Sequence, residues 1–146
     1  MAQVILLAAI ATLGVVDLAD HGYSNMWGAG AVVLGVALVL AGGSIAARAA
    51  WDLRAGLTPF PRPIDAAPLV VSGAYRLVRH PIYSGIVLAA FGWGTATASP
   101  PAIGATVLLF LLFDGKSRRE EAWLIAARPE YLDFRSRTKR FIPWVY

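Results

Sequence analysis

Hydrophobic residues are gathered into four long runs along this chain, with short polar or proline-rich stretches between them. About 20 apolar residues span the hydrocarbon of a bilayer, so long runs with few charges predict membrane helices. We expect an all-α integral membrane protein of about four transmembrane helices with a cytoplasmic C-terminal helical segment. The expected helices cover residues 4–19, 27–51, 81–98 and 101–127, and the C-terminal segment covers residues 130–146.

The first two runs carry few polar groups. Val4–Ala19 resembles the core of a signal peptide, but no Lys or Arg precedes it and no convincing cleavage context follows, so we interpret it as a membrane helix. We expect His21, in the polar turn that follows, to be solvated. The second run has Trp27 and Trp51 at its ends, as interfacial anchors do, and small residues at helical spacing that favour close helix packing.

Residues 55–72, between the second and third runs, contain four prolines and show no helical period. This composition predicts an irregular cytoplasmic connector, which is either a lid or binding segment or a disordered stretch. With 146 residues, the chain is expected to form a single domain, residues 1–146.

The third and fourth runs flank Ser99-Pro100-Pro101, a strong turn signal because proline is favoured at helix starts and cannot continue a helix inward. If both runs are antiparallel helices, depth is mirrored about this turn. His80 and Glu120 each lie about 20 positions from it, which is roughly 30 Å along a helix and one hydrocarbon thickness. The sequence therefore predicts that the Arg79-His80 and Glu120-Glu121 pairs lie side by side at one membrane face.

Composition agrees with a membrane protein. Mean hydropathy is +0.60, and only 15% of residues are charged, against about 25% in soluble domains. The chain has no Cys and its two His residues lie far apart, so we expect no metal site. All 13 Lys and Arg lie from Arg48 onward, in segments that follow the second and fourth runs. This distribution predicts a multi-pass protein, in bacteria one of the inner membrane, with both termini cytoplasmic.

The stretch around His80 is a candidate anion site. Pro81 suits the first helical position, so His80 lies at or near a helix N-terminus, where free N–H groups and the helix dipole favour an anion. Arg76 and Arg79 add positive charge. Together with the carboxylates predicted opposite, these residues favour a binding site at the membrane surface.

A purely structural interpretation competes with the binding site. The arginines before the third helix also fit determinants of topology, and Tyr75 and Tyr83 fit an interfacial aromatic belt. Similarly, Arg118 and Arg119 are candidates to neutralise the neighbouring Glu pair, since charges this close to the hydrocarbon are costly unless paired or solvated.

The C-terminal stretch interleaves aromatic and basic residues. This pattern suits the anionic headgroup layer of a membrane, so membrane lipids are the expected partner. Single-stranded nucleic acid is a distant second candidate, and we expect no nucleic-acid partner.

Two motifs carry a resemblance to a known family. They are GAYRLVRHPIYSG at residues 73–85 and REEAWLIAARPEYLDFRSRTKRFIPW from Arg119 onward. Together they resemble the isoprenylcysteine carboxyl methyltransferase and phospholipid N-methyltransferase superfamily, over about half of the chain. The resemblance implies an integral membrane enzyme that uses S-adenosylmethionine, bound at the cytosolic face between the last two helices and the C-terminal segment. The implied substrate is a lipophilic small molecule or lipid.

The resemblance also implies individual site residues. The implied cofactor-binding residues are Tyr75, Arg79, His80, Tyr83, Gly85, Glu120, Glu121 and Tyr131, and the implied catalytic residues are His80, Glu120 and Arg79. Arg135 and Arg140 match the C-terminal pattern, whereas Phe134 stands where a second Tyr is common.

The chemistry of the cofactor fits these residue types. The cations suit its carboxylate, and a Glu suits its ammonium or ribose hydroxyls. Tyr75, Tyr83 and Trp123 suit its adenine or sulfonium through stacking and cation–π attraction. A carboxylate or phenolate acceptor needs no strong base, whereas an amine must lose a proton to His80 or a Glu. The sequence leaves the acceptor open.

Two other functions compete with methyl transfer. Sterol reductases resemble the C-terminal half and share an Ile-Pro-x-x-Tyr-like tail, as in Ile142–Tyr146, and they would bind NADPH in the same pocket. Against that, Ile82 stands where the resemblance to reductases suggests Asn. The third possibility is a non-catalytic membrane protein whose charge clusters are structural.

Overall fold

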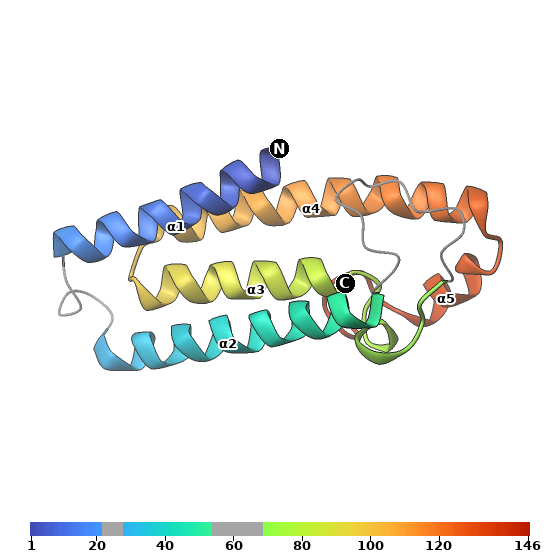
Figure 1. Cartoon of the computed structure of the whole chain (residues 1–146), viewed down its shortest axis with the longest axis horizontal. Coiled ribbons are helices and arrows are strands. Elements are labelled where there is room, and N and C mark those ends of the chain that lie inside the picture. Colours follow the sequence, from blue (N-terminus) through green and yellow to red (C-terminus); the bar gives the residue numbers. More distant parts are fainter. Residues whose placement is uncertain (22–27, 54–68) are drawn as a thin grey trace. The chain divides into compact units, whose positions relative to one another are not determined.

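The structure, a computed structural model, describes residues 1–21, 28–53 and 69–146 of the chain. These residues are almost entirely helical (Figure 1). The elements are α1 (Ala2–His21), α2 (Gly28–Leu53), the 3-10 helix η2 (Gly73–Arg76), α3 (Pro81–Ala96), α4 (Pro100–Ala127) and α5 (Tyr131–Arg137).

The all-α prediction is confirmed for the described residues, and the four long runs become α1 to α4. The helix starting at Pro81 and the one ending shortly before Pro129 agree with the proline signals. The turn after the first run and most of the predicted connector lie outside the described residues. The C-terminal segment is helical only over α5, because Thr138 turns to an extended conformation with φ −126° and ψ 153°.

The chain divides into two compact units. The first consists of Met1–Ser44 and Gly85–Leu112, and the second of Ile45–Ser84 and Phe113–Tyr146. Helices α2, α3 and α4 contribute residues to both units. That residues 1–146 form a single domain stays a prediction.

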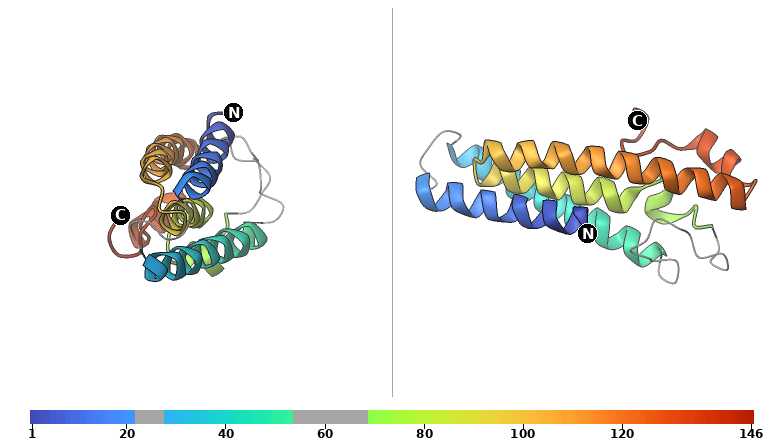
Figure 2. Two further views of the ribbon diagram at one scale, coloured as in Figure 1. Left: turned by 90° about the vertical axis from the view of Figure 1, so that its left-hand side faces the viewer. Right: turned by 90° about the horizontal axis from the view of Figure 1, so that it is seen from above.

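In the first unit, α3 lies between α2 on one side and α1 and α4 on the other (Figures 1 and 2). Glycines permit the closest approaches. A Cβ atom on Gly35 would overlap the backbone of Ala96, and one on Gly42 would overlap Gly85 and Ala89. The small residues at helical spacing in the second run therefore serve packing between α2 and α3, as predicted.

The turn between α3 and α4 is fixed by polar contacts within the first unit. Ala98 adopts a left-handed conformation (φ 49°), and the Ser99 hydroxyl accepts a hydrogen bond from the Ala102 N–H (3.2 Å). Ser99 thus caps α4, and Pro100 occupies its first position. The same hydroxyl donates to Asp17 of α1, which links the turn to the end of that helix.

Two described helices are long and apolar enough to cross a membrane, at Ala2–Asp20 and Gly28–Leu53. They agree with a membrane protein. Helix α3 has only 16 residues, which is about 24 Å, and α4 carries charges in its second half. Four transmembrane helices therefore stay a prediction.

The second unit has its own hydrophobic core. Ala49, Tyr75, Tyr131 and Phe134 are buried together, and the rings of Tyr131 and Phe134 meet edge to face with centroids 5.8 Å apart. This core joins α2, η2 and α5. It holds in place the two non-helical segments that carry the charged residues described next.

Candidate functional site

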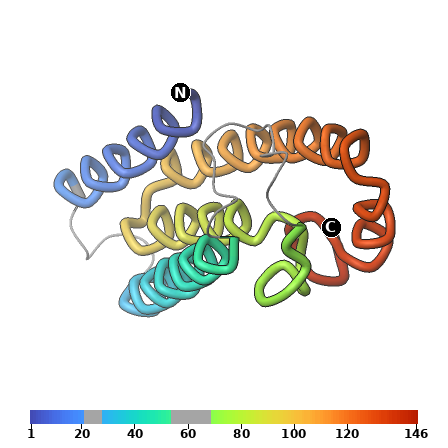
Figure 3. The backbone as a smooth tube through the Cα atoms, turned by 45° about the vertical axis from the view of Figure 1, so that its right-hand side comes forward, coloured from blue at the N-terminus to red at the C-terminus, as the bar shows by residue number. Residues whose placement is uncertain are grey.

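Two segments far apart in the sequence run side by side in the second unit (Figure 3). Val78 and Lys139 form a parallel β-bridge, and the N–H groups of Arg79 and His80 donate to the carbonyl oxygens of Lys139 (2.8 Å) and Arg140 (3.1 Å). The polypeptide immediately before α3 is therefore tied by its backbone to the segment after α5. This pairing brings Arg79, His80 and Arg140 to one place.

Glu121 of α4 is the centre of a buried charged cluster. Its side chain is 4% exposed and accepts hydrogen bonds from three cationic or ionisable groups, and Nε of Arg135 lies 3.8 Å from Oε2. Oε1 lies 2.9 Å from Nε of Arg79, 3.2 Å from Nε2 of His80 and 3.1 Å from Nε of Arg140. Oε2 accepts a further bond from Nη2 of Arg140 (3.3 Å). With this many donors, the negative charge of the buried Glu121 carboxylate is compensated by the protein's own side chains.

Arg79 is equally well anchored. Besides Glu121, its guanidinium donates through Nη1 to the backbone oxygens of Arg135 (3.2 Å) and Thr138, at the end of α5. Its side chain is 8% exposed. All of these partners belong to the protein, so Arg79 orders the junction of α4 with α5.

Glu120, the neighbouring residue on α4, has a different environment. Its side chain is 29% exposed and its Oε2 accepts a hydrogen bond from the hydroxyl of Tyr83 (3.2 Å). The same oxygen lies 3.9 Å from Nδ1 of His80. Within the described residues, no arginine contacts this carboxyl, so Glu120 is the less compensated member of the pair.

Aromatic rings surround the imidazole of His80. Tyr83 stacks on His80 with centroids 5.5 Å apart and on Phe113 at 4.5 Å. The Phe141 ring is tilted by 43° against His80 with centroids 5.9 Å apart, and the ammonium of Lys116 lies 5.3 Å from the centroid of the Tyr83 ring. The result is a charged cluster with an aromatic wall, which suits a ligand that has both cationic and planar parts.

Burial and hydrogen bonds separate the acidities of the two carboxyls, which lie beyond the part of α4 needed to cross a bilayer. Burial alone raises the pKa of Glu121, but hydrogen bonds from His80, Arg140 and Arg79 outweigh it and hold this pKa well below its usual range. For Glu120, burial raises the pKa above its usual value, and the attraction of His80 only partly offsets this. Glu121 is thus held as an anion, whereas Glu120 is the more basic of the two carboxylates.

A second ring of contacts holds Arg140 from the opposite side. Its Nη1 lies 3.0 Å from Oδ1 of Asp114, and the Tyr146 hydroxyl donates to the same oxygen (2.9 Å). Arg118 also contacts Asp114, through Nε at 2.7 Å. The sequence-based alternative that Arg118 neutralises the Glu pair is therefore wrong. The i, i+4 spacing on α4 brings Arg118 to Asp114 instead.

The structure brings most of the predicted site residues into the second unit. Tyr75 and Tyr131 lie in its core, and burial raises the pKa of both phenols, so they stay protonated. Gly85 belongs to the first unit, where its carbonyl oxygen packs against Gly42. The roles of all these residues in binding a cofactor stay predictions.

Asp114 and Tyr146 were not among the site residues predicted from the sequence. Both lie in the contacts around Arg140, and no spacing rule connects a helix with an irregular C-terminal return. The one usable signal was Asp114 itself, a carboxylate at the end of an apolar run, where a charge requires a partner.

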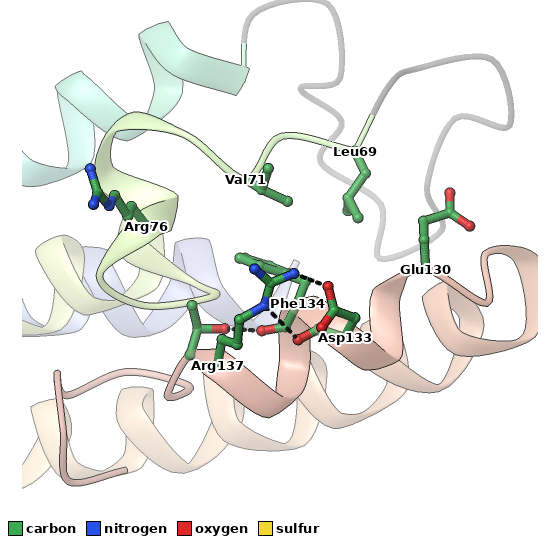
Figure 4. A pocket seen from close by; sticks show the side chains of 8 residues that line it. Leu69, Val71, Arg76, Glu130, Asp133, Phe134 and Arg137 are labelled. Atoms are coloured by element: carbon green, nitrogen blue, oxygen red, sulfur yellow. Dashed lines mark hydrogen bonds and ion pairs between the residues drawn. The ribbon is translucent and has the colours of Figure 1, made fainter.

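A cavity of about 630 Å³ lies between the extended segment near Leu69 and one face of α5 (Figure 4). Its lining residues are Leu69, Val71, Arg76, Glu130, Asp133, Phe134, Arg137 and Thr138. The volume suits a small ligand, but none of the predicted cofactor-binding residues lines it. Of the predicted residues, Arg79 and His80 instead contact Glu121 directly, and Tyr83 and Glu120 lie beside them.

Acidic and imidazole groups do not gather into a metal site in the described part of the chain. Nowhere among residues 1–21, 28–53 and 69–146 do three or more His, Cys, Asp or Glu side chains lie close enough together to hold an ion.

The described residues thus form long, apolar helices, and a buried cluster of charged side chains is centred on the part of α4 that follows its apolar stretch. A family model described as phospholipid methyltransferase matches residues 31–127, well over half of the chain. The chain belongs to the phospholipid methyltransferase family, and this membership indicates a membrane methyltransferase. Such methyltransferases generally use S-adenosylmethionine. The match includes the motif at His80 and the Glu pair.

A curated relative matches a smaller part of the chain. The cobalt-zinc-cadmium resistance protein CzcN of Cupriavidus metallidurans is 37% identical over 76 residues. The match covers 51% of this chain and 35% of that protein, so the chain spans about a third of the length of this relative.

Proposed function

We propose that this protein transfers a methyl group from S-adenosylmethionine to a lipophilic small molecule or lipid at the cytoplasmic membrane face. The observation that carries the proposal is the position of His80, whose two ring nitrogens face Glu121 (3.2 Å) and Glu120 (3.9 Å). One ring thus connects the two motifs on which the family resemblance rests. Family membership supports the reaction class.

The residues present fit the proposed cofactor. S-adenosylmethionine carries a carboxylate, an ammonium and a sulfonium. Glu120 suits a cationic group because no arginine among the described residues contacts it, and the Tyr83 ring beside it suits the sulfonium or adenine. Lys116, 5.3 Å from that ring, and His80 suit the carboxylate.

Within this assignment, Glu121 and Arg79 serve mainly to position the other groups. Three side chains already compensate Glu121, and Arg79 is bonded to it and to two backbone oxygens. We assign them the role of holding His80 and the start of α3 in place. Glu120, His80 and Tyr83 then form the surface that contacts the ligand.

The bound cofactor supplies an electrophilic methyl group attached to a sulfonium. The protein's part is to orient the reactants and to exclude water. A carboxylate acceptor needs no proton removal. An amine acceptor must lose a proton, and Glu120, whose pKa is raised by burial, is placed to accept it.

Calorimetry on the full chain in detergent tests the proposal. Titration with S-adenosylmethionine should give saturable binding, and titration with NADPH should give none. Binding of NADPH alone favours the reductase alternative, and binding of neither ligand favours a non-catalytic protein; both results contradict the proposal. Incubating lipid extracts with a methyl-labelled donor then identifies the acceptor.

Two substitutions test the site itself. Glu120→Gln and His80→Ala should each abolish binding of S-adenosylmethionine, while circular dichroism shows that the helices remain. Glu130→Gln is the matched control, because Glu130 is an exposed glutamate that does not belong to the cluster around Glu121. Retained affinity in both test variants removes the site assignment.

A further inference from the structure

The turn at Ile142–Val145 exposes apolar side chains next to the charged cluster. Trp144 is 86% exposed, Val145 71% and Ile142 50%. Three adjacent large apolar groups in water are costly, at about 25 cal/mol for each Å² of apolar surface. Exposed patches of this kind mark a surface that another apolar phase covers.

This turn is held in an unfavourable backbone conformation. Trp144 has φ 62°, in the left-handed region that an aromatic residue rarely adopts. Hydrogen bonds on both sides maintain it. The N–H groups of Val145 and Tyr146 donate to the Ile142 carbonyl (both 3.1 Å), and the Phe141 N–H donates to the backbone oxygen of Tyr146 (2.7 Å). The outward direction of Trp144 is thus imposed by the fold.

Contacts with α4 fix the height of the turn along that helix. The Tyr146 hydroxyl lies 2.9 Å from Oδ1 of Asp114, the first charged residue after the apolar stretch that ends at Phe113. Phe141, at the other end of the turn, is buried against His80. If α4 crosses the membrane as the sequence predicts, the turn lies at the boundary between hydrocarbon and headgroups.

Cations flank the turn. Arg118 donates to the Tyr146 hydroxyl (3.0 Å) and its side chain is 60% exposed, and Lys139, three residues before Ile142, is also exposed. Apolar side chains beside exposed cations match an interface in which acyl chains adjoin phosphate groups.

We propose that the Ile142–Val145 turn inserts into the interfacial layer of an anionic lipid leaflet and anchors the C-terminal segment beside His80. The partner is the lipid surface itself: Trp144 and Val145 enter the acyl boundary, and Arg118 and Lys139 contact lipid phosphates. This assignment relies on the membrane position of α4 and not on any methyl donor.

The natural absence of cysteine permits a direct test. Val145→Cys and Ser136→Cys, each labelled with an environment-sensitive fluorophore, are compared in nanodiscs that contain phosphatidylglycerol. Ser136 is an exposed residue of α5 and serves as the matched control. The label at position 145 should emit at shorter wavelength, be quenched by shallow nitroxide lipids and resist aqueous iodide several-fold better than the label at position 136.

Equal iodide quenching at the two positions overturns the proposal. Protection from both iodide and nitroxide lipid also overturns it, because the turn is then covered by protein, such as a second copy of this chain. If Val145→Cys does not fold, Ile142→Cys reports on the same turn.

In Arg118→Gln/Lys139→Gln, lipid quenching should no longer depend on phosphatidylglycerol; an unchanged dependence removes the assignment to anionic lipid. S-adenosylmethionine binding is measured separately, so the two proposals fail independently.

Discussion

His80 and Glu121 are 41 residues apart in the sequence, yet Nε2 of the imidazole lies 3.2 Å from Oε1 of the carboxylate. Because Glu121 is a compensated anion, it favours a hydrogen on Nε2 and leaves Nδ1 directed toward Glu120 at 3.9 Å. One histidine therefore lies between a carboxylate that is neutralised by the protein's own side chains and the carboxyl that, in the function we propose, contacts the ligand.

Replacing the two glutamates should have different effects on stability. Glu121→Gln leaves Arg79 without its buried counter-ion and Arg140 with Asp114 alone, so we expect a loss of about 3 to 5 kcal/mol in the free energy of unfolding. Glu120→Gln should change stability by less than about 1 kcal/mol, because the amide can still accept from Tyr83. Denaturant unfolding in detergent measures both. Equal losses would contradict the separate roles.

The decrease in the free energy of unfolding at acid pH should depend on Glu121. Its pKa in the folded protein lies below the ordinary value of 4.5, so the unfolded chain binds more protons at acid pH. The stabilising contribution is complete above that ordinary value and declines as the pH falls toward the folded pKa. Unfolding measured from about pH 6 to about pH 3 should show this decline, and Glu121→Gln should show a shallower one. Identical slopes in the two proteins would be the contrary outcome.

Much of this cluster could be predicted from the sequence. The position of His80 opposite the Glu pair followed from counting helical rise on both sides of Ser99-Pro100-Pro101, since both motifs lie on or next to regular helices. The helix start at Pro81 followed from proline stereochemistry. Regular geometry made these inferences possible.

Other parts could not be predicted because they depend on irregular backbone. The return from α5 to the Val78 bridge has no period, so nothing indicated that Arg140 would reach Glu121 or that Tyr146 would reach Asp114. Adjacent residues on a helix point about 100° apart, so the sequence also could not tell which of the two Glu residues faces inward.

Packing between α2 and α3 offers a matched pair of glycine substitutions. In Gly42→Ala the new methyl group would overlap backbone atoms of Gly85 and Ala89, whereas in Gly43→Ala it would meet nothing within 4 Å. We expect Gly42→Ala to lose about 1 to 3 kcal/mol and Gly43→Ala to gain up to about 1 kcal/mol from helix propensity. Thermal unfolding in detergent compares them. Equal melting temperatures would contradict this helix contact.

The Tyr146 hydroxyl should stabilise the C-terminal return. Tyr146→Phe removes the bonds to Asp114, Arg118 and Arg140 but keeps the ring, so we expect a loss of about 1 kcal/mol. Hydrogen exchange at the Phe141 amide should become faster. Trp144→Phe, at an exposed position, is the control and should leave exchange at Phe141 unchanged. Unaltered exchange in Tyr146→Phe would show that the hydroxyl contacts are dispensable.

The adjacent carboxyls on α4 also restrict the length of that helix. Deleting one residue between Phe113 and Glu120 would rotate everything beyond it by about 100° and draw it back by about 1.5 Å. Glu121 would then leave its hydrogen-bond donors, and Ala122 would take its place before the arginines. A deletion in this stretch is therefore incompatible with an intact cluster unless a compensating insertion restores the angular register.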